Sequence, residues 1–231
     1  MIVLVYFWSI PSASVPLAIA HMALDRRRLN SLKNRSAISF YKLLGTGKGE
    51  SFTPLDADPH RWGMLVCLPE SEISRFDNSA LVNNWRKFAR SEVRFTLTPI
   101  SAHGLWSGQE PFHPISLPDW NGPVAAITRA KIVPRENLRF WKSVPPVSKS
   151  LHDSEGLLAA IGIGEAPIGL QGTFSLWRDG ASLKEFAYKG AAHRQAIANT
   201  NTFQWYSEEL FARFAVIEQR GDFESPYIRQ N

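Results

Sequence analysis

The sequence predicts an α+β fold in which two tandem ferredoxin-like β-α-β-β-α-β modules form a dimeric-α+β-barrel-type architecture. Two observations predict it. Strand-like and helix-like segments follow the same order in both halves of the chain, and short motifs recur at an offset of about 110 to 120 residues. The chain has 231 residues, of which 44% are hydrophobic and 20% charged, so it can bury a core and is not disordered, collagenous or coiled-coil.

Three motifs of the first half recur in the second half. The pairs are 43–47 with 160–164, 62–68 with 171–177, and 93–97 with 210–214. Their spacing is the length of a module rather than of a solenoid repeat. The repeats place the first module at residues 1–104 and the second at 123–221. A proline-rich linker (105–122) joins them, and a tail (222–231) follows.

The first module begins with a buried strand. Residues 2–8 are β-branched, aliphatic or aromatic, which is typical of a strand covered on both faces. Ser12 or Ser14 then caps a helix, which argues against a membrane span at this uncharged end of the chain. The helices are expected over 14–29 and 71–90, and the remaining strands over 37–45, 62–68 and 93–101.

The second module follows the same order. Pro134 opens its first helix at the favoured first-turn position. Asp179 or Ser182 caps its second helix, and Ser182 with Glu185 fits a capping box. The strands are expected over 123–132, 156–163, 172–178 and 210–219, and the helices over 135–151 and 181–207.

The strand at 172–178 predicts how the sheets are covered. Phe174 and Leu176 point to one face of the sheet, and Thr173, Ser175 and Trp177 to the other. Helices are expected over one face, and the other sheet or a ligand over the other face. This arrangement gives a barrel within one chain or a sheet shared across a homodimer.

Charge and cysteine content narrow the partners and the compartment. The formal net charge is +5, and much of the excess lies in 26–28 with Lys33 and Arg35. This cluster has no interleaved aromatic residues, so we expect a solvated helix end and no nucleic-acid partner. Peripheral contact with an anionic inner-membrane surface stays open. Cys67 is the one cysteine, which excludes an internal disulfide and favours the cytoplasm.

The glycine-rich segment 45–49 is not a nucleotide-binding motif. No Ser or Thr follows the Gly47-Lys48 pair, and the glycine spacing fits neither the phosphate loop nor the dinucleotide fingerprint. We therefore expect a turn or a close backbone approach after a strand.

His193 is the histidine in the most suggestive context. It borders an apolar stripe on the expected helix 181–207, seven residues after Phe186, and small residues precede it. Spacing alone fits a partly buried structural histidine. The alternative is a neutral imidazole that ligates an iron porphyrin beside a wide apolar slot.

The segment after that helix adds three further candidates. Trp205 and Tyr206 fit either an apolar pocket or ordinary core. Arg213 lies in an otherwise apolar strand, where an isolated buried cation is costly. We expect it to pair with Glu165, with Glu209 or with an acidic group of a ligand such as a porphyrin propionate.

Segments spread over residues 1–220 resemble the spheroidene monooxygenase family. The resemblance is carried by 42–54, 162–167, 174–179, 186–189, 192–194 and 205–214. It implies an oxygen-dependent carotenoid ketolase with haem as its cofactor and a dimeric α+β barrel as its fold. The motif histidine of the family matches His193.

The first hypothesis is a haem-dependent monooxygenase, a ketolase or hydroxylase, with a hydrophobic, carotenoid-like substrate and a separate electron donor. Here His193 ligates the iron, while Arg194 and Arg213 neutralise propionates or assist oxygen polarisation. The residues that shape the cofactor pocket are Trp177, Trp205 and Phe211. The second hypothesis is a non-catalytic or cofactor-free barrel that binds a small apolar ligand. A haem enzyme of another class, such as a dehydratase, is a third.

Overall fold

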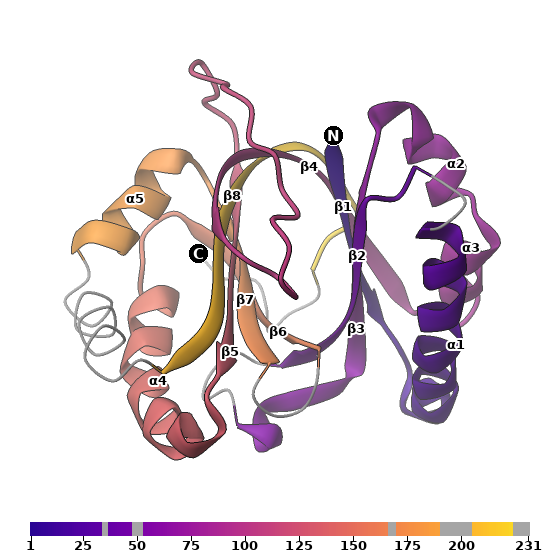
Figure 1. Ribbon diagram of the computed structural model, residues 1–231, viewed down its shortest axis with the longest axis horizontal. Helices are drawn as coiled ribbons and strands as arrows, with labels where there is room; N and C mark the ends of the chain where they lie inside the picture. The colour runs from indigo at the N-terminus through magenta and orange to yellow at the C-terminus, as the bar shows by residue number, and fades with distance from the viewer. Residues whose placement is uncertain (34–36, 48–52, 166–169, 190–204, 224–231) are drawn as a thin grey trace.

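The structure is a closed antiparallel β-barrel with helices on two opposite sides (Figure 1). This computed structural model describes residues 1–33, 37–47, 53–165, 170–189 and 205–223. The α+β class predicted from the sequence is confirmed, and the barrel closes within one chain. None of the described helices is both long and apolar enough to span a membrane.

Eight strands form the barrel in the part of the chain that the structure describes, in the order β1-β3-β2-β6-β7-β5-β8-β4. Their bounds are β1 (Ile2–Ser9), β2 (Phe40–Gly47), β3 (Ala57–Leu68), β4 (Ser91–Gly104), β5 (Val124–Ile132), β6 (Leu157–Gly164), β7 (Leu170–Trp177) and β8 (Tyr206–Arg220). The helices are α1 (Val15–Lys33), α2 (Ile73–Asp77), α3 (Ala80–Arg86), α4 (Asn137–His152) and α5 (Gly180–Lys189). Short 3-10 turns lie at Ser12–Ser14, Pro54–Asp56, Glu70–Glu72 and Pro134–Glu136.

The two recurring glycine motifs lie side by side where the barrel closes. Gly45 pairs with Gly164 and Gly47 pairs with Gly162 in the short ladder between β2 and β6. A Cβ on Gly47 would lie 2.9 Å from the carbonyl oxygen of Asp56, closer than real Cβ atoms come. The expected close backbone approach is therefore found at Gly47.

Apolar side chains fill the interior of the barrel. Phe7, Phe95 and Phe174 meet at its centre, where the ring centroid of Phe174 lies 5.2 Å from that of Phe7 and 5.1 Å from that of Phe95. Phe174 and Leu176 belong to this interior, whereas Trp177 packs in a separate cluster outside the sheet. The predicted alternation on β7 is thus confirmed.

Two expected helices end differently from the prediction. The helix expected over 71–90 is split into α2 and α3, because Ser79 is extended and caps α3 by accepting a hydrogen bond from the backbone N–H of Val82. The helix expected over 181–207 was wrong at its end, because Tyr206 and Ser207 already pair in β8. Its beginning is correct, since Asp179 caps α5 through the N–H of Ser182 at 2.8 Å.

Candidate active site

The outer face of the sheet β6-β7-β5-β8 is covered with small side chains. Strands β6, β7 and β5 each contribute two of these residues, which form two rows of residues paired across the ladders. We call these residues the platform: Ala126, Thr128, Ala160, Gly162, Thr173 and Ser175. No side chain among them is larger than threonine, and the two alanines are buried in a cluster with Trp177 and Leu183.

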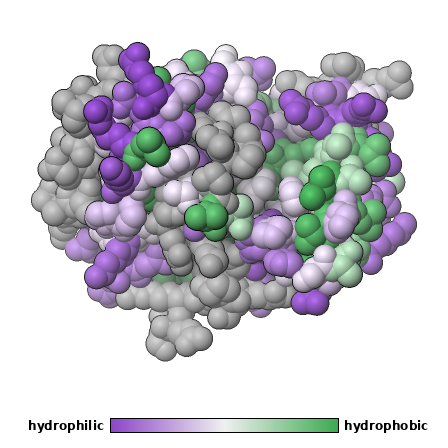
Figure 2. All heavy atoms as spheres, turned by 90° about the horizontal axis from the view of Figure 1, so that it is seen from below, coloured by the Kyte–Doolittle hydropathy of each residue, from purple (hydrophilic) through white to green (hydrophobic). Residues whose placement is uncertain are grey.

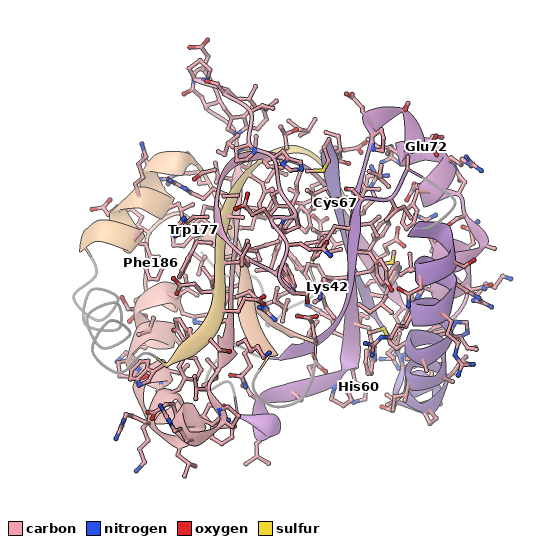
Figure 3. The ribbon with its side chains drawn as sticks, in the orientation of Figure 1. Lys42, His60, Cys67, Glu72, Trp177 and Phe186 are labelled. Carbon is pink, nitrogen blue, oxygen red and sulfur yellow. The ribbon has the colours of Figure 1, made fainter. Side chains whose placement is uncertain are left out.

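Helix α5 covers one end of the platform. Trp177 is fully buried between the sheet and α5, with its ring centroid 5.4 Å from that of Phe186 (Figure 3). Its indole N–H donates to the hydroxyl of Ser175 at 2.9 Å, which fixes the ring beside the platform. Leu183 of α5 packs into the same cluster.

Strand β8 borders the platform with Phe211 and Arg213. In the register of β5 and β8, Phe211 lies opposite Thr128 and Arg213 lies opposite Ala126. Phe211 remains 42% exposed, which is unusual for a side chain of this size beside a helix-covered sheet. Three of the residues singled out from the sequence, Trp177, Phe211 and Arg213, therefore lie on one face of the sheet.

The ion pair expected between Arg213 and Glu165 was wrong. Glu165 follows β6 and accepts from Lys42 at 2.5 Å and from Arg129 at 3.2 Å, inside the barrel rather than on its outer face. Arg213 is half-buried and forms no ion pair with any residue that the structure describes, Glu209 included.

The other sequence candidates lie apart or outside the described residues. Trp205 is buried just before β8 and packs edge-on against Phe140 of α4, with ring centroids 6.1 Å apart. Its carbonyl oxygen accepts from the N–H of Val133 at 2.8 Å. His193 and Arg194 lie outside the described residues.

Sequence reasoning missed a buried ion-pair network at one end of the barrel. Arg129, which is 5% exposed, pairs with both Glu165 and Glu208. The indole N–H of Trp106 donates to Glu165 at 2.6 Å. The missed signal was an isolated arginine in the apolar segment 124–132, the same kind of signal that drew attention to Arg213.

Glu208 fixes the β4–β5 connection over this end of the barrel. It accepts from the backbone N–H groups of Ser107 at 3.0 Å and Gly108 at 2.6 Å. Burial alone would raise the pKa of Glu208, but these N–H groups and the guanidinium of Arg129 hold it below its usual range. The carboxylates of this network pair with cations of the protein, while Arg129 Nε is buried without a hydrogen-bond partner among the described residues.

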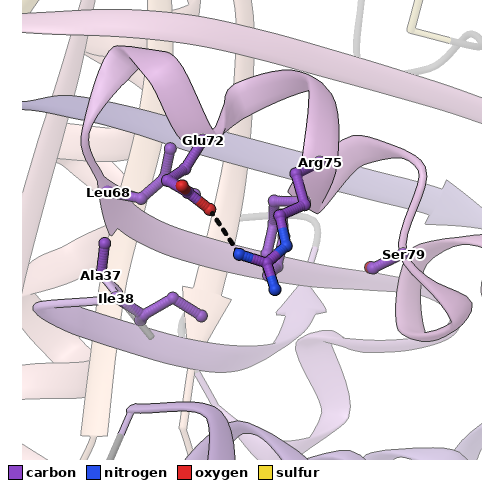
Figure 4. Close-up of a pocket in the computed structure, with 7 residues that line it drawn as sticks. Ala37, Ile38, Leu68, Glu72, Arg75 and Ser79 are labelled. Carbon is purple, nitrogen blue, oxygen red and sulfur yellow. Dashed lines mark hydrogen bonds and ion pairs between the residues drawn. The ribbon is translucent and has the colours of Figure 1, made fainter. Parts of the chain in front are cut away.

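Two further features of the molecule do not provide an alternative site. Among the described residues, no three His, Cys, Asp or Glu side chains gather closely enough to hold a metal ion. A pocket of about 80 Å³ lies between α2 and the end of β3, lined by Ile38, Leu68 and Arg75 among others (Figure 4). That volume is far too small for a porphyrin or a carotenoid. The platform is therefore the candidate site.

Comparison with solved structures identifies the class of fold. An aldoxime dehydratase aligns over 99% of this chain and 85% of its own, with a TM-score of 0.56 and 11% identity. This likeness shows the fold alone: the protein shares its α+β barrel with that enzyme.

Comparison of sequences identifies the family. No family model matches the chain. The spheroidene monooxygenase of Rhodobacter capsulatus is 36% identical over 217 residues, which cover 92% of this chain and 88% of that protein. That of Rubrivivax gelatinosus is 36% identical over 184 residues, which cover 79% of this chain and 70% of that protein. The chain belongs to the spheroidene monooxygenase family and is a monooxygenase, an enzyme of the oxidoreductase class.

Proposed function

We propose that the protein is a haem-dependent, oxygen-using ketolase or hydroxylase whose substrate is a carotenoid. The observation that carries this proposal is the 36% identity with the spheroidene monooxygenase of Rhodobacter capsulatus, because it extends over 92% of the chain. Monooxygenation places one atom of O₂ in the substrate and reduces the other to water. The two electrons and two protons therefore come from a separate donor.

The platform has side chains small enough to lie against a flat macrocycle. Ala126, Ala160, Gly162 and Ser175 are buried, so a porphyrin would approach this face beside Thr128 and Thr173, which are half-buried. Trp177 and Phe211 would border the ring at the two ends of this face. Bound haem supplies the activation of oxygen, while the chain supplies orientation and the exclusion of water.

Arg213 would hold a propionate of the haem. Its guanidinium is half-buried, lies opposite Ala126 of the platform, and has no carboxylate partner among the described residues. Such a group is a good bidentate partner for a carboxylate of a ligand. His193 as a ligand of the haem iron, Arg194 as a second cation and Trp205 as a residue of the cofactor pocket rest on the family resemblance. Trp205 packs against Phe140 of α4, apart from the platform.

We further propose that the two halves of the barrel are tandem ferredoxin-like modules, residues 1–104 and 123–221. In support, β1 to β4 with α1 to α3, and β5 to β8 with α4 and α5, follow one order. The central strand of each half also pairs alike, β1 with β3 and β4, and β5 with β7 and β8.

Haemin titration of the purified full-length chain tests the site. The wild type should develop a Soret band that is lost in His193→Ala and weakened in Arg213→Leu. Ala126→Leu and Thr173→Met should weaken haemin binding at least about tenfold, because each raises a side chain above the platform. The matched control is Ala181→Leu, which adds the same bulk at an exposed position of α5.

Substrate oxidation is measured separately on the haem-loaded protein with a carotenoid, O₂ and a chemical reductant. The expected product carries one additional oxygen atom from ¹⁸O₂. If both platform variants are folded by circular dichroism and bind haemin as the wild type does, the platform is not the haem site. If haemin binds but no carotenoid is oxidised, the proposed substrate is wrong while the site stands.

A further inference from the structure

The first half of α1 turns an apolar face outward. From Val15 to Leu24 the one polar side chain is His21, which packs against the rings of Trp85 and Phe88. Leu17, Ile19 and Leu24 instead leave 47%, 55% and 47% of their surface exposed. A surface helix normally presents polar side chains to water. Figure 2, which views the molecule from below, shows hydrophobic side chains gathered on the side where α1 lies.

An exposed cationic segment follows directly. Arg26, Arg27 and Arg28 are exposed, while Asp25 is fully buried and accepts from the indole N–H of Trp85 at 2.7 Å. Arg28 pairs with Asp25 at 3.1 Å. Arg26 and Arg27 have no ion pair with any described residue. The outward surface therefore joins an apolar segment to two unpaired positive charges.

We propose that this surface, the α1 face (Leu17, Ile19, Leu24, Arg26 and Arg27), binds the enzyme to an anionic lipid bilayer. The leucines and the isoleucine would enter the boundary between headgroups and acyl chains, and the arginines would contact lipid phosphates. The charge pattern favours a bilayer over a second copy of the chain. Asp25, the one acidic residue of α1, is buried, so a second α1 face would offer the arginines no carboxylate.

The strand at the start of the chain plays no part in this contact. Residues 2–8 are buried in the barrel, so the apolar strand of the uncharged N-terminal sequence is not available to a membrane, whereas α1 is. The α1 face and the platform lie on opposite sides of the barrel (Figure 1). The contact therefore holds the enzyme at a membrane without covering the platform, and it does not depend on the identity of the cofactor or the substrate.

Vesicle co-sedimentation of the full-length protein tests the proposal. The vesicles are pure phosphatidylcholine, or equal parts of phosphatidylcholine and phosphatidylglycerol. The wild type should bind the anionic vesicles and lose that binding as salt is raised. Arg26→Gln with Arg27→Gln should weaken binding on the order of 25-fold, about fivefold for each charge removed. Leu17→Gln, Ile19→Gln and Leu24→Gln together should weaken it at least about tenfold.

The matched control replaces three exposed apolar residues elsewhere. Leu55→Gln, Ile115→Gln and Leu138→Gln together change positions that are 95%, 52% and 70% exposed, and should bind as the wild type does. The proposal is overturned if the wild type does not co-sediment with anionic vesicles, or if both α1-face variants bind these vesicles as the wild type does. It is also overturned if sedimentation equilibrium without lipid shows that the wild type is a dimer and the α1-face variants are monomers, because the α1 face then binds a second copy of the chain.

Discussion

The outer faces of the two halves of the barrel have the same strand pairing but carry side chains of different size. In the first half, Leu4 lies between Val66 of β3 and Thr96 of β4. In the second half, Ala126 occupies the corresponding place between Ser175 of β7 and Arg213 of β8. Ala126 and Ser175 of the second half thus correspond to the buried Leu4 and Val66 of the first half. Arg213 corresponds to Thr96.

The next row repeats the contrast. In the first half, Tyr6 lies between Met64 and Arg94. In the second half, Thr128 lies between Thr173 and Phe211. The first-half face is further filled by Trp8 and Trp85, whose stacked rings lie 5.0 Å apart.

The same architecture can therefore be stable with either kind of face. The first is packed by many large side chains on the sheet itself, whereas in the second Trp177 and Leu183 pack over small residues. Burying aromatic and aliphatic side chains is the main source of stability in a domain of this size. A face that gives up this packing is typical of a place where function takes precedence over stability. The comparison thus supports the proposed placement of the site in the second half without reference to any motif.

Aromatic truncation should separate the two faces most strongly. Trp85→Ala removes a fully buried ring and leaves the carboxylate of Asp25 without its indole donor, so we expect a loss of about 3–5 kcal/mol in the free energy of unfolding. Phe211→Ala, at a residue that is 42% exposed, should cost less than about 1 kcal/mol. Urea unfolding followed by circular dichroism measures both. Equal losses would mean that the second-half face is packed as firmly as the first.

Removal of one arginine from each face gives a second, smaller contrast. Arg94 is 1% exposed and pairs with Asp77 at 3.1 Å and with Glu218. Arg94→Met would remove the buried cation that Asp77 and Glu218 share, leaving Asp77 paired with Arg86 at 2.7 Å and with Arg220 at 3.5 Å, and should cost about 2 kcal/mol. Arg213→Met should change stability by within about 0.5 kcal/mol, because no described carboxylate depends on Arg213. A large loss in Arg213→Met would assign that residue a structural role and remove it from the proposed site.

The sequence was sufficient for features that depend on local pattern. Alternation placed Phe174 and Leu176 on one face of the strand and Trp177 on the other, which the structure shows to be the inside and the outside of the barrel. The cap of α5 by Asp179 follows from local hydrogen-bonding chemistry. The split between α2 and α3 was missed, because the apolar periodicity continues across Ser79 while the backbone does not.

Features that depend on partners far along the chain could not be predicted. Arg129 and Glu208 are separated by 79 residues, and nothing in either segment marks the other as its partner. For the same reason, Glu165 was considered as a partner of Arg213, whereas it pairs with Arg129. A single sequence does not show which face of a distant strand Glu165 will contact. The contrast between the platform and the face of Tyr6 likewise requires the register of the strands.

Acid should destabilise the first-half face through Asp77, the smallest of the three effects. Burial raises the pKa of Asp77, but hydrogen bonds from Arg86 and Tyr6 and the charge of Arg94 lower it further, and the net result lies below its usual range. The stabilisation that Asp77 provides is therefore fully present above its unfolded pKa, about 4, and is lost as the pH falls through the folded value.

Asp77→Asn removes this titration, so the stability difference between wild type and variant should be greatest near neutral pH and should narrow below about pH 4. Glu208, whose pKa is also lowered, titrates in both proteins and cancels from the difference, whereas Glu218 shares Arg94 and Arg220 with Asp77 and adds to it. Urea midpoints measured at several pH values provide the data, and Asp119→Asn, at an exposed position, is the control that should leave the slope unchanged. A difference that stays constant with pH would mean that Asp77 acts on the first-half face as a hydrogen-bond acceptor alone. The charge network would then not be what distinguishes that face from the platform.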